Sequence, residues 1–106
     1  MMNENSQEEI IFSVIYTTTY KKELKKYKNQ PSKLEKLLDI IEILSKKGTE
    51  GVPIENKPHP LTGNYKACLE CHIEPDFLLI WKQYDEEKLI VLERIGSHSE
   101  LFGKKK

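Results

Sequence analysis

Apolar and polar positions in the first part of the chain predict a strand followed by a short helix. Residues 10–16 are apolar and β-branched, which is typical of a strand. Between about residues 20 and 28, Tyr20, Leu24 and Tyr27 recur at helical spacing, and three threonines in front of them offer a cap. We expect this helix to bury its aromatic stripe and to turn its lysines to water.

A second helix is the clearest element of the pattern. Ser32 and Glu35 have the spacing of a capping box, and Gly48 supplies a stop. The apolar positions that repeat at helical spacing between these signals, and that we expect in the core, are Leu34, Leu37, Leu38, Ile41 and Leu44. Residues 49–63 then hold glycines and prolines at a density that predicts an irregular surface loop, with His59 inside it.

From residue 64 the apolar period changes to two. The positions expected to be buried are Tyr65, Ala67, Leu69, Cys71 and Ile73, and the intervening polar positions are Asn64, Lys66, Cys68, Glu70 and His72. Residues 74–76 then predict a tight turn, and the continuous apolar run over 77–81 suits a central strand. A hairpin at residues 85–87 leads to the last strand, roughly residues 89–95.

These elements predict an α+β fold in the order β-α-α-β-β-β, with two helices packed on one antiparallel sheet. We expect residues 1–9 to form a flexible polar leader and residues 10–106 to form a single domain. The leader lacks the basic and apolar regions of a signal peptide, and no apolar run is long enough to span a bilayer. The sequence therefore predicts a cytoplasmic protein without membrane contact.

Charge gives a local signal only. Lys+Arg and Asp+Glu are both 17, so the net charge of +0 offers no global reason to expect nucleic acid. The lysines nevertheless gather within residues 21–36, opposed there only by Glu23 and Glu35. A solvated helix face explains this cluster as well as a docking surface does.

Cys68 and Cys71 form a C-x-x-C pair that would ordinarily suggest a redox or zinc site. Residues three apart in a strand point to opposite faces, so the two sulfur atoms are expected to diverge. The chain also has no second cysteine pair to complete a zinc site. We expect one buried and one exposed free cysteine.

The three histidines, His59, His72 and His98, all fall in polar contexts at predicted strand or loop edges. Imidazole titrates near neutrality, so one histidine can take a proton while another gives one, as RNA cleavage through the ribose 2′-hydroxyl requires. Arg94, the only arginine among 17 basic residues, shares strand parity with His98 and suits a phosphate. An arginine in an ordinary ion pair would look the same in the sequence.

The same side chains permit a metal site as an alternative. His59, His72, His98 and Asp76 are ligand types for zinc or iron and could converge. Their spacing matches no standard metal motif, so general acid–base work is the favoured interpretation.

Four segments of the second half resemble the YafQ family of the RelE/ParE toxin superfamily. They are His59-Pro60-Leu61, Gly63-Asn64-Tyr65-Lys66, residues 71–80 and residues 94–102. Their H-P-L, H-I-E-P-D and R-x-G-[ST]-H-x-x-L-F elements occur in the order and spacing of that family, and the helical N-terminal half agrees in layout. Together these elements are highly specific, and the resemblance implies a RelE-like fold.

The resemblance also implies an activity. A YafQ-type toxin of a type II toxin-antitoxin system is an endoribonuclease that enters the 30S ribosomal A site and cuts the bound messenger RNA. We expect it to need no metal and no cofactor. Its implied partners are a cognate antitoxin protein, the ribosome and messenger RNA, and the toxin-antitoxin complex is expected to bind operator DNA through the antitoxin.

Family positions that form the active surface match six residues here: His59, His72, Asp76, Arg94, His98 and Phe102. From the chemistry above, His59 or His72 is assigned as the general base and His98 as the general acid. Asp76 is expected to orient a histidine or tune its charge. Arg94 is expected to hold the scissile phosphate.

Three further side chains are expected to contact substrate. Phe102 would stack on a base. Phe77 stands where the family often has Trp, and it is assigned to nucleotide contact together with Lys66, with a change in packing alone as the alternative for Phe77. The resemblance gives the lysine cluster a use as well, since a toxin that docks on ribosomal RNA needs positive charge, and the same charge would attract an acidic antitoxin.

Two other functions stay open. The superfamily shares one scaffold between nucleases and ParE-like toxins that inhibit DNA gyrase without catalysis. A pure binder has no need for three histidines, an aspartate and an arginine around one face, so the nuclease is favoured. A relic that only forms a regulatory complex with its antitoxin on DNA is the other alternative.

Overall fold

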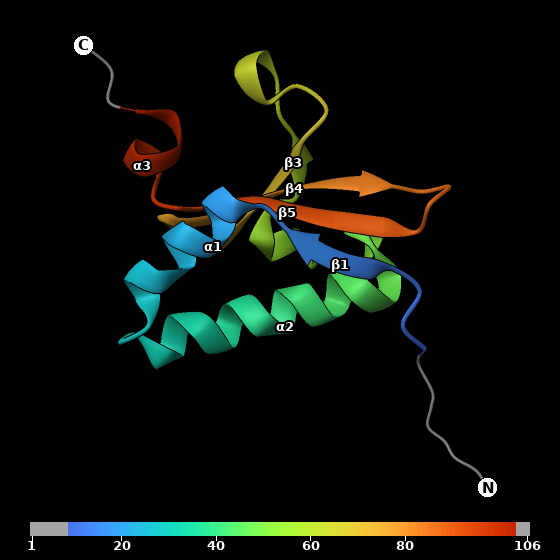
Figure 1. Cartoon of the computed structure of the whole chain (residues 1–106), viewed down its shortest axis with the longest axis horizontal. Helices are drawn as coiled ribbons and strands as arrows, with labels where there is room; N and C mark the ends of the chain where they lie inside the picture. Colours follow the sequence, from blue (N-terminus) through green and yellow to red (C-terminus); the bar gives the residue numbers. More distant parts are fainter. Residues whose placement is uncertain (1–8, 104–106) are drawn as a thin grey trace, which may run out of the picture.

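The computed structural model describes residues 9–103 and contains one five-stranded sheet with the strand order β1-β5-β4-β3-β2 (Figure 1). The strands are β1 (Ser13–Tyr16), β2 (His59–Pro60), β3 (Leu69–Glu74), β4 (Phe77–Tyr84) and β5 (Leu89–Gly96). The helices are α1 (Thr18–Leu24), α2 (Pro31–Lys47) and α3 (His98–Phe102). The predicted α+β class is confirmed, while residues 1–8 of the predicted leader lie outside the described residues.

Strand direction differs from the prediction at one edge. β2, β3, β4 and β5 pair antiparallel, but β1 runs parallel to β5, with Val14 beside Ile90. Parallel neighbours need a long connection, and α1 and α2 both lie in the chain between β1 and β5. Apolar periodicity identifies a strand but carries no information about its direction.

The helix ends show which capping signals are used. Thr17 caps α1, because its Oγ1 accepts a hydrogen bond from the backbone of Tyr20 at 3.0 Å. The capping box predicted at Ser32 is wrong: α2 begins one residue earlier, at Pro31, whose fixed φ suits the first helical position. Gly48 ends α2 as predicted, with a φ of 72° that favours glycine.

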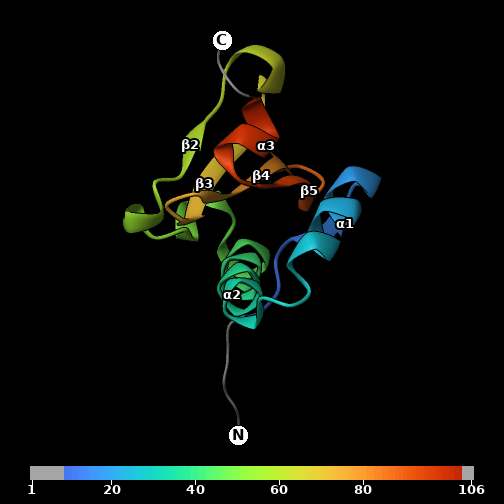
Figure 2. The ribbon, with the colours of Figure 1, turned by 90° about the vertical axis from the view of Figure 1, so that its left-hand side faces the viewer.

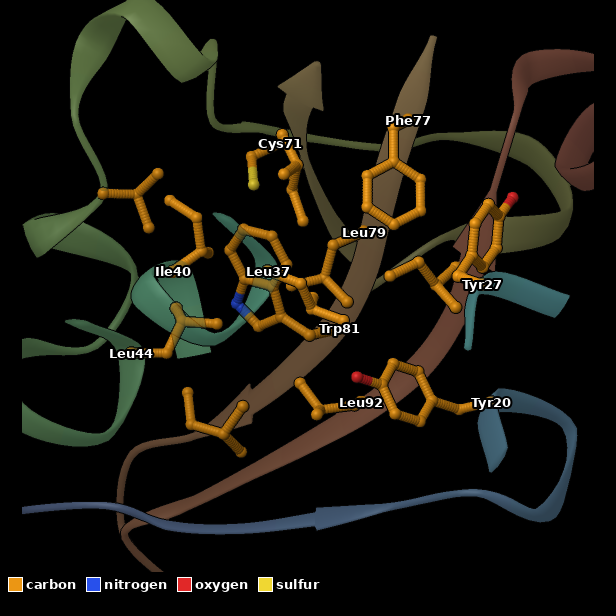
Figure 3. Close-up of a cluster of buried hydrophobic side chains, with 14 of the residues drawn as sticks. Tyr20, Tyr27, Leu37, Ile40, Leu44, Cys71, Phe77, Leu79, Trp81 and Leu92 are labelled. Atoms are coloured by element: carbon orange, nitrogen blue, oxygen red, sulfur yellow. The ribbon is translucent and has the colours of Figure 1, made fainter. Parts of the chain in front are cut away.

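The main core lies between the sheet, α2 and the segment of α1 that continues to Tyr27 (Figure 3). β4 contributes Phe77, Leu79 and Trp81, which pack against the α2 residues Leu37, Ile40 and Leu44 and against the tyrosines Tyr20 and Tyr27. The Trp81 indole N–H donates to Thr49 Oγ1 at 3.0 Å, so this buried polar atom is satisfied. Leu38 is 62% exposed, so its assignment to the core is wrong.

A second, smaller core covers the other face of the sheet. Cys68, Leu78, Ile80 and Leu101 are buried together there, because α3 packs over this face while α2 packs on the opposite one (Figure 2). Cys71 belongs to the main core, so the two sulfurs diverge as predicted. Both cysteines are buried, however, and the expected exposed cysteine is absent among the described residues.

β4 is therefore covered on both faces, which explains its continuous apolar run. No helix within residues 9–103 has the length and apolar character needed to cross a membrane.

Candidate active site

The three histidines meet on the sheet face that α3 covers. His59 comes from β2, His72 from β3, and His98 is the first residue of α3. The ring centroids of His59 and His72 are 6.2 Å apart, and those of His72 and His98 are 5.5 Å apart. The expectation that these residues share one region is confirmed by the structure.

Strand register brings a buried carboxylate into this cluster. Glu70 lies directly across the β2–β3 pair from His59, and it precedes His72 by two residues on the same face of β3. Its Oε1 is 3.1 Å from His59 Nε2 and 3.8 Å from His72 Nε2. Glu70 is only 3% exposed, and its Oε2 has no hydrogen-bond partner within the described structure.

Glu70 was not singled out from the sequence. Its signal was the spacing of two that separates it from His72, which places both side chains on one face of a strand. A glutamate at a polar position of a half-buried strand is ordinarily solvated, whereas this one is buried beside His59 of β2 and His72 of β3.

The second ring nitrogen of His59 also faces an oxygen. His59 Nδ1 is 2.7 Å from the backbone carbonyl of Lys57. A carbonyl oxygen only accepts, so Nδ1 carries the proton in this contact. Both ring nitrogens of His59 are therefore engaged inside the protein.

Asp76 and His98 form a second acid–imidazole contact. One Asp76 oxygen, Oδ1, lies 2.6 Å from His98 Nδ1 and accepts the His98 backbone N–H at 2.8 Å. These backbone and ring hydrogen bonds lower the pKa of Asp76, so the carboxylate stays ionised at neutral pH. His98 Nδ1 accordingly donates, and its Nε2 is left for substrate.

Aromatic side chains border this pair. Phe102 is 45% exposed, and its ring lies 6.5 Å from that of His98 and 5.6 Å, edge to face, from that of Tyr65. Lys66 follows Tyr65 on an exposed turn. An exposed aromatic ring beside an imidazole offers a flat surface of the kind on which a nucleobase stacks.

Arg94 occupies a different position from the one expected. Its Nε and Nη2 donate to Glu23 Oε2 at 2.8 and 2.5 Å, and its Nη1 donates to the Tyr65 hydroxyl at 2.5 Å. The Glu23 contact raises the pKa of Arg94 further. Because Nε and Nη2 are both engaged by Glu23, the structure shows Arg94 in the ion-pair alternative, and its role in holding the scissile phosphate stays a prediction.

Phe77 is also corrected. Asp76 lies in the exposed turn, but Phe77 begins β4 and points to the opposite face, into the main core, where it is 1% exposed and 4.7 Å from the Tyr27 ring. It is therefore a core residue, and its assignment to nucleotide contact is wrong.

The metal alternative has little geometric support. Within residues 9–103, no group of three or more His, Cys, Asp or Glu side chains is placed to hold a metal ion. The arrangement instead offers three imidazoles and two carboxylates next to an exposed aromatic ring: His59 and His72 lie beside Glu70, and His98 lies beside Asp76.

Comparison with known proteins gives the family. A sequence profile described as the bacterial toxin of type II toxin-antitoxin system, YafQ, matches residues 12–103. The chain belongs to the YafQ toxin family. This YafQ-family chain is 36% identical over 88 residues to the mRNA interferase toxin YafQ of Escherichia coli K12, covering 83% of this chain and 92% of that protein.

Solved structures agree with the YafQ assignment. The crystal structure of the E. coli DinJ-YafQ toxin-antitoxin complex contains a chain that matches with a TM-score of 0.75 and 35% identity, covering 89% of this chain and 100% of that one. A metal-bound toxin from Helicobacter pylori matches with a TM-score of 0.72 and 32% identity, over 86% and 99% of the two chains. The predicted YafQ-type toxin and its RelE-like fold are confirmed.

Proposed function

We propose that this YafQ-family toxin is an mRNA interferase, a ribosome-dependent endoribonuclease that works by histidine acid–base chemistry without a metal. The observation that carries the proposal is the His72–His98 pair, with ring centroids 5.5 Å apart beside the exposed Phe102. The named activity of the E. coli K12 relative supports the mRNA interferase activity.

The reaction needs one base and one acid. A neutral imidazole, that of His59 or His72, removes the proton of a ribose 2′-hydroxyl, and the oxygen attacks the adjacent phosphorus. The bond from phosphorus to the 5′-oxygen breaks, and His98 Nε2 gives that oxygen a proton while Asp76 accepts from Nδ1. The products are a 2′,3′-cyclic phosphate and a free 5′-hydroxyl.

Arg94 takes an indirect role in this scheme. It donates to the Tyr65 hydroxyl, which in turn donates to the Leu101 carbonyl of α3 at 3.0 Å. This network holds the helix that carries His98 and Phe102. Lys66, exposed on the adjacent turn, supplies the positive charge that contacts the RNA backbone.

Partners follow from charge and from the relatives. Five exposed lysines of α1 and the turn after it form a basic surface suited to ribosomal RNA near the 30S A site; they are Lys21, Lys22, Lys25, Lys26 and Lys28. The DinJ-YafQ complex supports a cognate antitoxin for this chain. We also propose that the toxin-antitoxin complex binds operator DNA through that antitoxin. The toxin would act in the cytoplasm, where its ribosomal target lies.

Replacing Phe102 with alanine should lower the cleavage rate by about tenfold, because stacking on an aromatic ring contributes roughly 1–3 kcal/mol per base. Single-turnover cleavage of a ribosome-bound message measures this. Tyr84→Ala removes another exposed aromatic ring, 41% exposed on β4, and is the matched control that should leave the rate unchanged. Equal rates for Phe102→Ala and wild type would remove Phe102 from the substrate surface.

The proposal is tested by primer extension on a defined message in a purified translation system. Enzyme freed of metal with EDTA and desalted is compared as wild type and His98→Ala, with and without ribosomes. Discrete cuts in the A site that require both ribosomes and His98 are expected. Growth arrest in cells without any cleavage would overturn the proposal and direct attention to DNA gyrase, whereas activity that returned only with added zinc would overturn metal independence.

A further inference from the structure

The three histidines differ in how many of their ring nitrogens already have a partner inside the protein. His59 has both nitrogens engaged, with Nδ1 at 2.7 Å from the Lys57 carbonyl and Nε2 at 3.1 Å from Glu70 Oε1. We propose that His59 and Glu70 are a positioning pair that acts through His72, and that His72 is the histidine that meets the 2′-hydroxyl. This inference rests on the proposed nuclease function.

The contacts of His59 require a proton between it and Glu70. The Lys57 carbonyl fixes a proton on Nδ1. A neutral His59 would then turn the lone pair of Nε2 toward the carboxylate, and two acceptors would face one another at 3.1 Å. The contact is favourable only when Nε2 or Oε1 carries a second proton, so the pair holds one proton that it shares.

The backbone around His59 is shaped for this contact. Lys57, which provides the accepting carbonyl, has a φ of 55°, in the left-handed region that residues other than glycine rarely adopt. Such conformations cost free energy and persist where the surrounding structure determines them. His59 is thus held on two sides, by the turn before β2 and by β3.

His72 is held less completely. Asn56 fixes its backbone by donating to the His72 carbonyl at 2.8 Å, and its Nε2 lies 3.8 Å from the same Glu70 Oε1. That separation exceeds a hydrogen bond, and active-site hydrogen bonds often tighten when substrate binds. Its Nδ1 has no hydrogen-bond partner among residues 9–103, and its ring packs against that of His98.

These contacts define what each group does in the reaction. Glu70 accepts the Nε2 proton of His72, which leaves the lone pair on Nδ1 to remove the 2′-hydroxyl proton. The imidazolium formed on His72 is then stabilised by the carboxylate beside it. His98 protonates the departing 5′-oxygen as before, so His59 supplies no atom to the bond changes and serves to hold Glu70 in place.

The free-energy cost of burying the Glu70 carboxylate also indicates a functional role. The groups that face it are His59 from β2 and His72 from β3, with Cys71 next to it in the chain and the apolar Ile80 across from it on β4. A buried carboxylate oxygen without a partner, such as Glu70 Oε2, destabilises a fold. A residue kept for packing alone would have no need of this charge.

Glu70→Gln tests the inference, because glutamine keeps the shape and removes the charge. Glu74→Gln is the matched control, the same change on the same strand at a residue that binds Lys33 and Lys36 instead. We expect Glu70→Gln to keep or raise the melting temperature while it lowers the single-turnover cleavage rate about 10- to 100-fold, the range found for the carboxylates that orient metal-binding histidines. Glu70→Asp, which restores a carboxylate, should recover part of the rate.

Nitrogen-15 NMR of the imidazoles reads the shared proton without any RNA. At neutral pH we expect wild-type His59 and Glu70 to show a proton shared at Nε2, and Glu70→Gln to convert His59 to a single tautomer protonated at Nδ1. His72→Gln should lose at least tenfold more activity than His59→Gln, since only His72 meets the substrate.

The inference would be overturned if Glu70→Gln cut at the wild-type rate, or if its cleavage rate and its melting temperature fell together. Equal losses of activity in His59→Gln and His72→Gln would also overturn it. An unchanged His59 spectrum in Glu70→Gln would overturn the shared proton. If the nuclease proposal itself failed, the wild-type protein would not cut RNA. The NMR experiment would still show whether His59 and Glu70 share a proton.

Discussion

Replacement of His98 by glutamine is expected to lower the rate of messenger cleavage by about 10²- to 10⁴-fold, the contribution of a positioned general acid or base. His98 Nε2 has no hydrogen-bond partner among residues 9–103, while its Nδ1 is fixed by Asp76 at 2.6 Å. Glutamine can fill the space and still donate a hydrogen bond, but it cannot transfer a proton at neutral pH. Single-turnover cleavage on ribosomes programmed with one codon in the A site measures the loss.

The fold should survive this change. The His98 side chain is half exposed, and the hydrogen bond from its backbone N–H to Asp76 does not depend on the side chain. Ser97 and Glu100 cap α3 on their own. If circular dichroism and antitoxin binding are unchanged, the defect of His98→Gln lies in the chemical step. Ser99→Ala, which should stay active, is the neighbouring control. A His98→Gln enzyme that cut within threefold of the wild-type rate would exclude His98 as the acid.

Arg94→Gln should lower the free energy of unfolding by about 2–4 kcal/mol, because breaking a largely buried ion pair leaves a charge without compensation. Glu23 is 9% exposed, binds the guanidinium through Oε2 and also accepts the Ile95 backbone N–H at 2.9 Å. For a domain of this size the loss corresponds to a fall of roughly 10–20 °C in melting temperature. Differential scanning calorimetry measures it directly.

The double variant Glu23→Gln/Arg94→Gln is the control for charge. With both ions removed, no unpaired charge is left in the interface between α1 and β5, so stability should recover by more than half of the single-variant loss. A single Arg94→Gln variant as stable as wild type would show that the pair is a solvated surface contact. Cleavage by the double variant would further show that Arg94 does not clamp the phosphate.

Periodicity predicted the elements that bury one regular face. The spacing of Tyr20, Leu24 and Tyr27 marked α1, and the unbroken apolar run of β4 marked the central strand. Leu38 follows the same helical spacing yet is 62% exposed, so the sheet covers only part of the apolar side of α2. Pattern alone does not say how wide the opposing surface is.

The helix that covers the other face of the sheet, α3, could not be predicted in the same way. α3 spans only His98–Phe102 and is specified by the Ser97 capping box, with too few residues to show a helical period. Because this helix was missing from the prediction, the face of β3 beneath it was expected to be polar and open. Cys68 is buried there in one cluster with Leu101 of α3.

The candidate site divides along similar lines. Residue types and their polar contexts indicated that the three histidines and Asp76 could converge, and the structure brings them together. The strand parity of Arg94 and His98 assumed an extended chain, whereas His98 begins α3. The partner of Arg94 could not be found this way, because Glu23 lies 71 residues earlier in the chain and meets it only through tertiary packing. Phe77 was assigned to nucleotide contact from the family resemblance, whereas successive residues in an extended chain point to opposite faces, so Phe77 faces the core while Asp76 is exposed.

The most direct test of the account is cleavage of a message that carries a single 2′-deoxynucleotide at the cut position in the ribosomal A site. If histidines activate the 2′-hydroxyl, wild-type toxin should cut the all-ribose message and leave a 2′,3′-cyclic phosphate, and the deoxy message should stay intact at that position. Equal cleavage of both messages would contradict the acid–base mechanism, because the bond would then break without the hydroxyl that His72 is proposed to deprotonate.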